Sequence, residues 1–306
     1  MPKIGVNKIQ TFAGHKDAIY ALSPDIERNW FLSAGGDGMV VRWNLSDRTD
    51  GELIARVPNS VYSIHLIAGR QQVLVGHNYE GLHAVDLTER KELASLKITD
   101  AAIFDIKTAA GSVYVACGDG SVVHVLPDPY RINRRIKASA MSARTMACQN
   151  DLGHLAVGFS DHHIRIYDQK NFTLINEFRA HLNSVFTLAY SPDGRYLLSG
   201  GRDARLNIWD AAAGYRQENS IIAHLYAINR IGYNQDGSLF ATCSLDKTFK
   251  IWKADEFRLL KVVDRARYGG HLTSVNNVLW PGYNDWLVTC SDDRTVSVWD
   301  IGLNAG

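Results

Sequence analysis

Histidine, serine or threonine, and aspartate recur together in this sequence, and these are the side-chain types of a hydrolytic triad. In such a triad the histidine takes the hydroxyl proton and the aspartate orients the imidazole. Four segments carry the set, with 18 residues from histidine to hydroxyl, 4 from hydroxyl to aspartate and 6 more to a tryptophan. The four sets are His15, Ser33, Asp37, Trp43; His181, Ser199, Asp203, Trp209; His224, Thr242, Asp246, Trp252; and His271, Thr289, Asp293, Trp299.

The fourfold recurrence argues against catalysis, because an enzyme needs one nucleophile in one cleft. A repeated set that ends in tryptophan is better explained as a buried hydrogen-bonded network from indole N–H through hydroxyl and imidazole to carboxylate. No GxSxG nucleophile elbow accompanies the sets. We therefore expect structural roles for all sixteen residues, which we call the tetrads, and no catalytic residue.

Two other kinds of motif could hold a ligand. The glycine-containing segments at 35–38 and 118–120 are not followed by GK[ST], so they indicate turns between strands and not a phosphate cradle. His77 and His83 fit neither a helical HExxH pair nor a zinc site that contains cysteine. The sequence therefore predicts no metal site and no cofactor.

The tetrads belong to a longer repeat. Seven segments of similar pattern end at positions spaced by 42, 40, 42, 42, 43 and 47 residues. Each unit alternates apolar and polar residues in four short stretches separated by turn residues, which predicts four strands per unit and an all-β fold. The units end near Trp43, Val85, Val125, Tyr167, Trp209, Trp252 and Trp299.

This pattern resembles the WD40 β-propeller family, whose unit is about 40–45 residues long. The resemblance covers nearly the full chain and implies one domain over residues 1–306, a seven-bladed propeller of four-stranded antiparallel blades. The family's repeat begins in the last strand of the preceding blade. The segment from about Val6 to Phe12 is therefore expected to complete the seventh blade beside residues 296–299 and so close the ring.

Units two to four depart from the tetrad pattern. The corresponding residues are Val57, Val75, Tyr79, Val85; Thr99, Val115, Asp119, Val125; and Ser139, Val157, Asp161, Tyr167. The full polar network cannot form in these units, so their blades must depend on apolar packing and strand pairing.

The resemblance also implies where a partner binds. In this family the top face, formed by the loops before the first strand and between the second and third strands of each blade, commonly binds peptides or proteins around the central channel. The residue five after each histidine position is expected at the channel mouth: Tyr20, Tyr62, Phe104, Arg144, Phe186, Asn229 and Asn276. Aromatic residues and arginine are enriched in interface hot spots.

Two further features extend the predicted partner site. Arg202 precedes the aspartate of the fifth unit, a position that usually lies on the same face. An insertion of about five residues before His271 falls within 264–270 and carries Arg265, Arg267 and Tyr268. Because insertions in loops are often neutral, these residues are also compatible with no function at all.

Composition restricts the function further. The 33 lysine and arginine residues nearly balance 32 acidic ones, which argues against a nucleic-acid binder. The start lacks the apolar segment of a secretory signal and no run is long enough to span a membrane, so we expect a cytoplasmic protein without membrane attachment. We predict a non-enzymatic interaction module or scaffold that binds a peptide or loop of a protein partner on the top face.

Two alternatives remain open. One is an enzyme with its active site at the channel mouth. The other is a nucleic-acid-associated protein that uses local basic patches, such as the stretch 130–137, for which an exposed basic edge strand is the simpler explanation.

Overall fold

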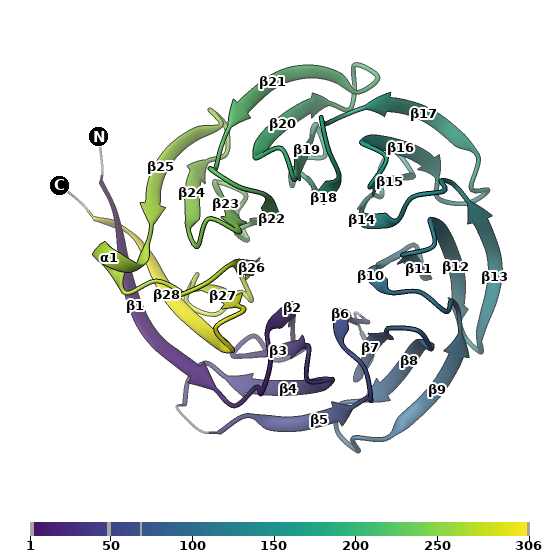
Figure 1. The fold of residues 1–306 in the computed structure, drawn as a ribbon, viewed down its shortest axis with the longest axis horizontal. Helices are drawn as coiled ribbons and strands as arrows, with labels where there is room; N and C mark the ends of the chain where they lie inside the picture. The colour runs from purple at the N-terminus through teal and green to yellow at the C-terminus, as the bar shows by residue number, and fades with distance from the viewer. Residues whose placement is uncertain (1–2, 48–49, 68, 305–306) are drawn as a thin grey trace.

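A computed structural model describes residues 3–47, 50–67 and 69–304 of the chain. They form seven four-stranded antiparallel sheets arranged as blades around a central channel (Figure 1). The predicted seven-bladed β-propeller is therefore confirmed. In each blade the first strand lines the channel and the fourth lies at the rim.

The first four blades follow the chain in order. Blade one comprises β2 (Ile19–Pro24), β3 (Trp30–Gly35), β4 (Met39–Asn44) and β5 (Glu52–Arg56). Blade two comprises β6 (Val61–Leu66), β7 (Gln72–His77), β8 (Gly81–Asp86) and β9 (Glu92–Lys97). Blade three comprises β10 (Ile103–Ala109), β11 (Ser112–Cys117), β12 (Ser121–Pro127) and β13 (Tyr130–Lys137). Blade four comprises β14 (Ala143–Gln149), β15 (His154–Phe159), β16 (His163–Asp168) and β17 (Leu174–Arg179).

The remaining blades include the only helix among the described residues. Blade five comprises β18 (Val185–Tyr190), β19 (Tyr196–Gly201), β20 (Arg205–Asp210) and β21 (Arg216–Ile222). Blade six comprises β22 (Ile228–Tyr233), β23 (Leu239–Ser244), β24 (Phe249–Lys253) and β25 (Arg258–Val263), and the short helix α1 (Arg265–Tyr268) follows it. Blade seven comprises β26 (Val275–Leu279), β27 (Leu287–Ser291), β28 (Thr295–Asn304) and β1 (Lys3–Ala13).

The ring is closed by β1, which pairs antiparallel with β28 as the outermost strand of blade seven (Figure 1). The pairing runs from Lys3 opposite Asn304 to Ala13 opposite Thr295, so it is longer than the predicted segment. Ile4, Val6 and Phe12 of this strand are buried. Both ends of the described chain therefore meet in one sheet, and the seam has no unpaired inner edge.

The hydrophobic core lies between the blades. One cluster joins Phe31 and Trp43 of blade one to Val288 and Val296 of blade seven. Another joins Leu198 and Leu206 of blade five to Phe240 and Trp252 of blade six. Each sheet buries both faces against its neighbours, which explains why the second strands are buried at nearly every position.

The four tetrads are connected networks. In blade one, Trp43 Nε1 donates to Ser33 Oγ at 2.7 Å, Ser33 donates to His15 Nε2 at 2.7 Å, and His15 Nδ1 donates to Asp37 at 3.0 Å. Blades five, six and seven repeat these links at 2.8 to 2.9 Å. The four central hydroxyls are fully buried. They have the connections of a catalytic hydroxyl but no access to a substrate.

The geometry of the blade-one tetrad also determines its charge. Burial outweighs the neighbouring Asp37 carboxylate and lowers the pKa of His15, so the imidazole stays neutral. Burial alone would raise the pKa of Asp37, but the backbone amides of Lys16 and Met39, together with His15, hold it below its usual range. The same carboxylates also bond the backbone of the histidine loop, as Asp203 does with Leu182 N at 2.8 Å.

Blades two to four hold only parts of this network. In blade four Ser139 donates to Asp161 at 2.7 Å, and in blade three Thr99 donates to Asp119 at 3.2 Å. In both blades a hydroxyl at the histidine position bonds directly to the aspartate, so the buried hydroxyl and the tryptophan of a complete tetrad are missing. Blade two has Val57 and Tyr79 at these positions and no such link between them can form.

We expect blades two to four to open more readily than blades five to seven, because they lack the buried clamp between three strands. In native-state hydrogen exchange followed by mass spectrometry, the amides of β7, β11 and β15 should exchange faster than those of β19, β23 and β27. Equal or greater protection of the first group would contradict this prediction.

Candidate functional site

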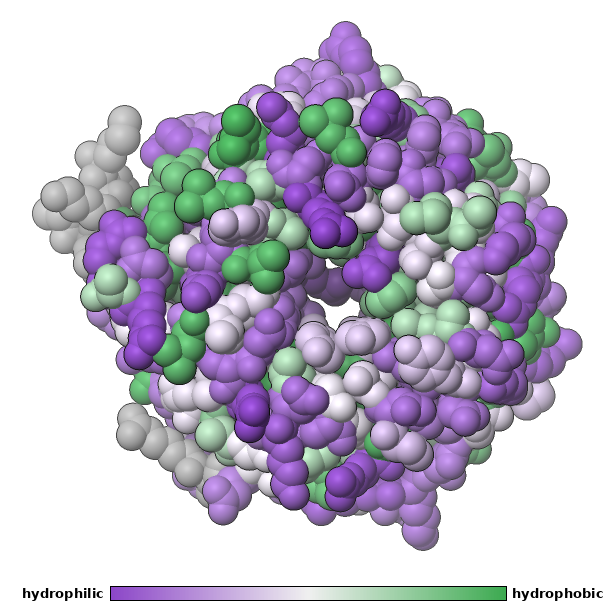
Figure 2. All heavy atoms as spheres, viewed as in Figure 1, coloured by the Kyte–Doolittle hydropathy of each residue, from purple (hydrophilic) through white to green (hydrophobic). Residues whose placement is uncertain are grey.

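The mouth of the central channel holds a cavity of about 480 Å³. Figure 2 shows this face of the molecule, with the mouth as its central hollow. All seven residues that the repeat register placed here line the cavity, together with Tyr79, Ala102, Arg230 and Asn277. The structure therefore brings the predicted aromatic residues and Arg144 to one site.

A β-bulge at the same place in every inner strand explains this arrangement. The pairing of β2 with β3 skips Tyr20 between Ile19 and Ala21, and the pairing of β18 with β19 skips Phe186. The other five inner strands skip Tyr62, Phe104, Arg144, Asn229 and Asn276. A bulged residue is left out of the ladder and its side chain is re-aimed. The bulges thus present one side chain per blade to the channel mouth.

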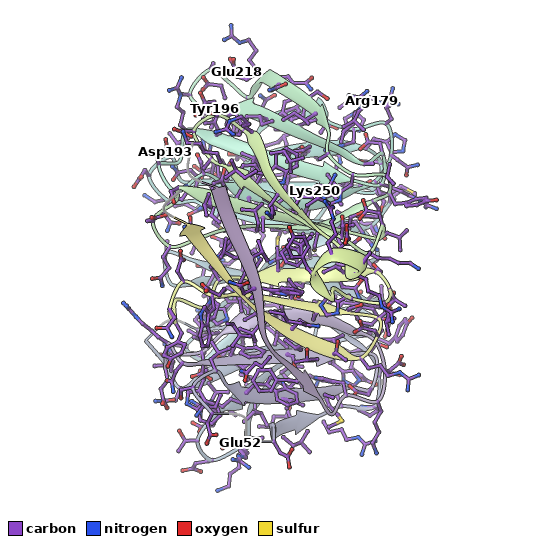
Figure 3. All side chains as sticks on the ribbon, turned by 90° about the vertical axis from the view of Figure 1, so that its left-hand side faces the viewer. Glu52, Arg179, Asp193, Tyr196, Glu218 and Lys250 are labelled. Atoms are coloured by element: carbon purple, nitrogen blue, oxygen red, sulfur yellow. The ribbon has the colours of Figure 1, made fainter. Side chains whose placement is uncertain are left out.

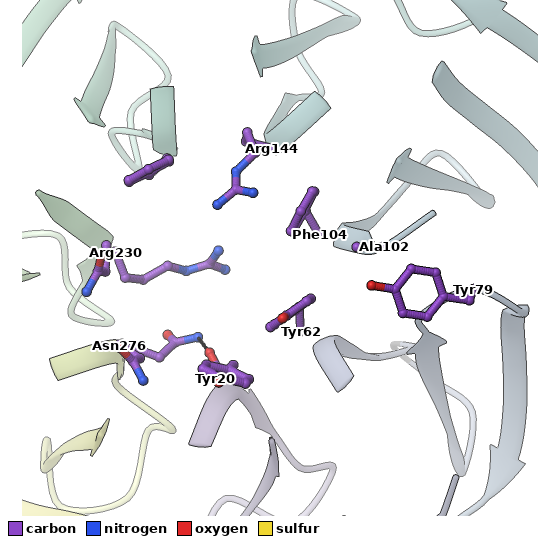
Figure 4. A pocket seen from close by; sticks show the side chains of 11 residues that line it. Tyr20, Tyr62, Tyr79, Ala102, Phe104, Arg144, Arg230 and Asn276 are labelled. Carbon is purple, nitrogen blue, oxygen red and sulfur yellow. Dashed lines mark hydrogen bonds between the residues drawn. The ribbon is translucent and has the colours of Figure 1, made fainter. Parts of the chain in front are cut away.

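Five of these side chains form a continuous arc. The ring centroids of Tyr20 and Tyr62 lie 4.8 Å apart, and those of Tyr62 and Phe104 lie 5.6 Å apart. The guanidinium carbon of Arg144 lies 3.8 Å from the Phe104 centroid and 4.9 Å from that of Phe186. We call these five residues the aromatic arc. It spans blades one to five and lines the cavity (Figure 4).

The other side of the mouth is polar. Asn276 Nδ2 donates to Ile19 O at 2.9 Å and to Asp292 at 2.7 Å, and Asn277 Nδ2 donates to Tyr20 O at 3.2 Å. Asn229 Nδ2 donates to Val275 O at 2.9 Å. These amides connect the inner strands of blades six, seven and one, so they fix the shape of the rim.

Sequence reasoning missed four lining residues. Arg230 and Asn277 directly follow bulged positions, and a bulge presents two consecutive residues instead of one. Tyr79 occupies the turn where a tetrad aspartate would stand, and it is 57% exposed. The loss of the tetrad in unit two was therefore a signal that this turn position is available to a ligand.

Titratable groups also lie on the inner strands near the mouth. Asp105 accepts a hydrogen bond from Lys107 at 2.9 Å. Burial would raise the pKa of Asp105, but Lys107 and Arg230 hold it below its usual value. Burial, aided by Lys107, lowers the pKa of His65 to about 4. Burial also lowers the pKa of Lys107, against the opposing effect of Asp105.

The insertion at 264–270 folds as α1, at the rim beside β1 (Figure 1). Arg267 pairs with Asp264 at 2.7 Å, Tyr268 packs partly buried against the blade-seven core, and Lys8 of β1 donates to Gly269 O at 2.7 Å. Arg265 and Arg202 are exposed, and neither lines the cavity. The structure does not bring these four residues to the mouth, and their role in binding a partner stays a prediction.

The same face carries exposed apolar side chains over blades five to seven. Leu182, Leu225 and Leu272 each follow a tetrad histidine and are 69%, 83% and 47% exposed, and Tyr226 is 60% exposed. Figure 2 shows apolar groups on this part of the face. Exposed apolar clusters of this kind mark interaction surfaces.

Figure 3 shows the disc from its edge. Asp193 and Tyr196 lie on the side opposite Arg179.

Comparison with known proteins agrees with the geometry. The model of the family described as WD domain, G-beta repeat matches residues 6–44, 172–210, 216–253 and 263–300, about half of the chain. The chain belongs to the WD40 repeat family. The four matches are the units that carry tetrads, and each begins within or just before the outer strand of the preceding blade, as the first does in β1.

The sequence identity between this chain and individual proteins is low. The chain is 26% identical over 206 residues to human striatin-3 and 25% identical over 201 residues to mouse striatin, in both cases about two thirds of this chain and 22% of the relative. It is 32% identical over 73 residues to human WD repeat-containing protein 36, which is 24% of this chain and 8% of the relative. The chain thus spans about a fifth of the striatins it matches.

Two further properties bear on the site. Among the described residues no three histidine, cysteine, aspartate or glutamate side chains come together in a way that could hold a metal ion. No helix in the described part of the chain is long and apolar enough to cross a membrane. The cytoplasmic location stays a prediction.

Proposed function

We propose that this WD40 propeller is a non-enzymatic interaction module that binds an extended peptide or loop of a protein partner across the channel mouth. The observation that supports this most directly is the aromatic arc. It places four ring systems and a guanidinium in one concave site, and these side chains dominate the energetics of protein interfaces. The WD40 family and the similarity to striatins support a scaffold role in general.

The chemistry of the mouth suits a peptide. Within the described residues, the hydroxyls of Tyr20, Tyr62 and Tyr79 make no hydrogen bond to the protein, so they are available to main-chain groups of a ligand. The rings that line the cavity can bury apolar side chains of the ligand. The exposed leucines of blades five to seven extend the apolar surface beyond the mouth for a folded part of the partner.

The two alternatives from the sequence receive less support. The hydroxyls of the tetrads are buried, which removes the recurrent hydrolase-like residues from consideration as an active site. The basic stretch forms the outer strand β13, where Arg134, Arg135 and Lys137 donate to the carbonyl groups of Asn171, Ile98 and Asp119. These cations serve neighbouring loops and strands, which favours a structural role over binding to nucleic acid.

A triple variant tests the proposal. We expect Tyr62→Ala, Phe104→Ala and Phe186→Ala together to abolish binding of partners captured by the parent from extracts of the source cells, because loss of each hot-spot aromatic costs on the order of 2 kcal/mol. Bound proteins are identified by mass spectrometry, and circular dichroism confirms that the variant folds.

The matched control removes two aromatic residues that lie away from the channel mouth. Tyr196 and Phe257 form an edge-to-face pair at 5.3 Å in blades five and six, with Tyr196 on the side away from the mouth (Figure 3). The variant Tyr196→Ala, Phe257→Ala should retain every partner. A folded triple variant that also retains every partner would contradict the proposal.

A further inference from the structure

Two arginines from different blades reach into the channel mouth. Arg144 is the bulged residue of β14, and Arg230 follows the bulge of β22. Their guanidinium groups extend from blades four and six into the same cavity (Figure 4). Within the described residues, neither guanidinium has a carboxylate within 4.0 Å or a hydrogen-bond acceptor in the protein.

Other partly buried arginines of this protein have partners. Arg42 pairs with Asp25 at 2.8 Å, and Arg165 pairs with Asp161 at 2.8 Å and Glu177 at 2.7 Å. Arg70 lies 3.6 Å from Asp128, and Arg205 donates to Ser220 at 3.0 Å. Arg144 and Arg230 differ from all four, and both line the same cavity. The pattern indicates that their partner is outside the chain.

Arg144 is also held in place before any ligand arrives. It lies between the rings of Phe104 and Phe186, which attract a cation by their quadrupoles and restrict its rotamers. Burial lowers the pKa of its guanidinium, which remains charged at neutral pH. A cation that is partly removed from water and lacks a counter-ion favours the arrival of an anion.

The carboxylate in the channel does not satisfy these groups. Asp105 accepts from Lys107 at 2.9 Å and Ile106 N at 3.1 Å through one oxygen, and from Met146 N at 2.7 Å through the other. Its hydrogen bonds are thus directed to the inner strands and to Lys107. The guanidinium of Arg230 remains available to a ligand in the mouth.

We infer that Arg144 and Arg230 together bind one acidic side chain of the partner, and that an apolar residue beside it in the peptide packs on Tyr20 and Tyr62. The inference rests on the proposed function and specifies its ligand as an acidic peptide. A carboxylate and a phosphoryl group share the required chemistry, because both present several anionic oxygens to two guanidinium forks.

Synthetic heptapeptides test the inference. Fluorescein-labelled Gly-Ser peptides carry glutamate, phosphoserine, glutamine or lysine at the centre, followed by phenylalanine, and binding to the full chain is measured by fluorescence anisotropy. We expect the glutamate or the phosphoserine peptide to bind roughly tenfold or more tightly than the glutamine peptide, with a preference that falls as salt rises. The better of the two identifies the source of the anion.

Arginine variants test whether the preference for the acidic peptide depends on Arg144 and Arg230. Arg144→Met and Arg230→Met should each reduce the preference for the acidic peptide strongly, and the double variant should reduce it to about one. Arg195→Met is the matched control, because its guanidinium lies 4.8 Å from the Tyr196 ring at the opposite end of blade five. It removes the same charge over an aromatic ring and should leave the preference unchanged.

Several outcomes would overturn the inference. These are binding of none of the acidic peptides, equal binding of the glutamate, phosphoserine and glutamine peptides, or a preference that persists in the double variant. The proposed function fails separately, when the triple aromatic variant retains all captured partners. If that variant loses its partners while Arg144→Met with Arg230→Met keeps them, the interaction site stands and its acidic specificity does not.

Discussion

Removal of residues 1–12 should lower the melting temperature by more than about 10 °C. The truncation removes nearly all of β1 and with it the buried side chains of Ile4, Val6 and Phe12. Each buried apolar side chain of this size contributes about 1.5–3 kcal/mol. The expected loss is therefore several kcal/mol, and each kcal/mol shifts the melting temperature of a domain of this size by roughly 2–4 °C.

The truncated protein should also associate. Without β1 the outer edge of β28 is an unpaired strand of up to ten residues, and open edges pair with other chains. Calorimetry and analytical ultracentrifugation measure the two effects. A peptide of residues 3–13 added in trans should raise the melting temperature again. Asn7→Ser, at an exposed position of β1, serves as the control. An unchanged melting temperature after truncation would show that the seam does not hold the ring.

The second large effect is expected for Thr242→Val in blade six. The threonine hydroxyl accepts from Trp252 Nε1 at 2.9 Å and donates to His224 Nε2 at 2.8 Å, and it is fully buried. Valine fills the same space but leaves two buried polar groups without a partner, at about 1–3 kcal/mol each. We expect a loss of roughly 2–5 kcal/mol in the free energy of unfolding, measured by urea denaturation.

Blades two to four explain why the cost depends on the partners and not on valine itself. They carry Val75, Val115 and Val157 at the same position, and their indole position holds Val85, Val125 or Tyr167. Combining Thr242→Val with Trp252→Phe should therefore cost less than the two single substitutions added together. Thr88→Val, in the exposed turn after β8, should change stability by less than about 0.5 kcal/mol. A loss below about 1 kcal/mol for Thr242→Val would contradict the account.

Regular spacing made the ring predictable from the sequence. The seven blades and the closing strand followed from the period and from the position of the first segment relative to His15. The same period identified the seven bulged residues, because every inner strand bulges at the same register position. Residues in phase along the chain occupy equivalent places in space, so alignment alone brought Tyr20, Tyr62 and Phe104 together.

Other features of the site depend on strand pairing and on side-chain length, which the spacing of the repeats does not reveal. A bulge adds a residue to one strand only, so the contribution of Arg230 and Asn277 is visible only in the hydrogen-bond register. The approach of Arg230 toward Arg144 depends on the length of a side chain that extends into the channel mouth. The insertion before His271 was readable as extra length, but its folding as α1 depends on the cap that Asp264 provides.

The bulges have a consequence for how this scaffold can change. A bulged residue takes no part in the regular pairing of its strand. The type of its side chain is therefore set by its surroundings in the channel and is not restricted by packing within the sheet. The seven positions here hold four aromatic residues, one arginine and two asparagines, and all seven blades are four-stranded. Exchanging the five residues of the aromatic arc should alter what the mouth recognises while the ring keeps its stability, because the two asparagines and the tetrads maintain the fold.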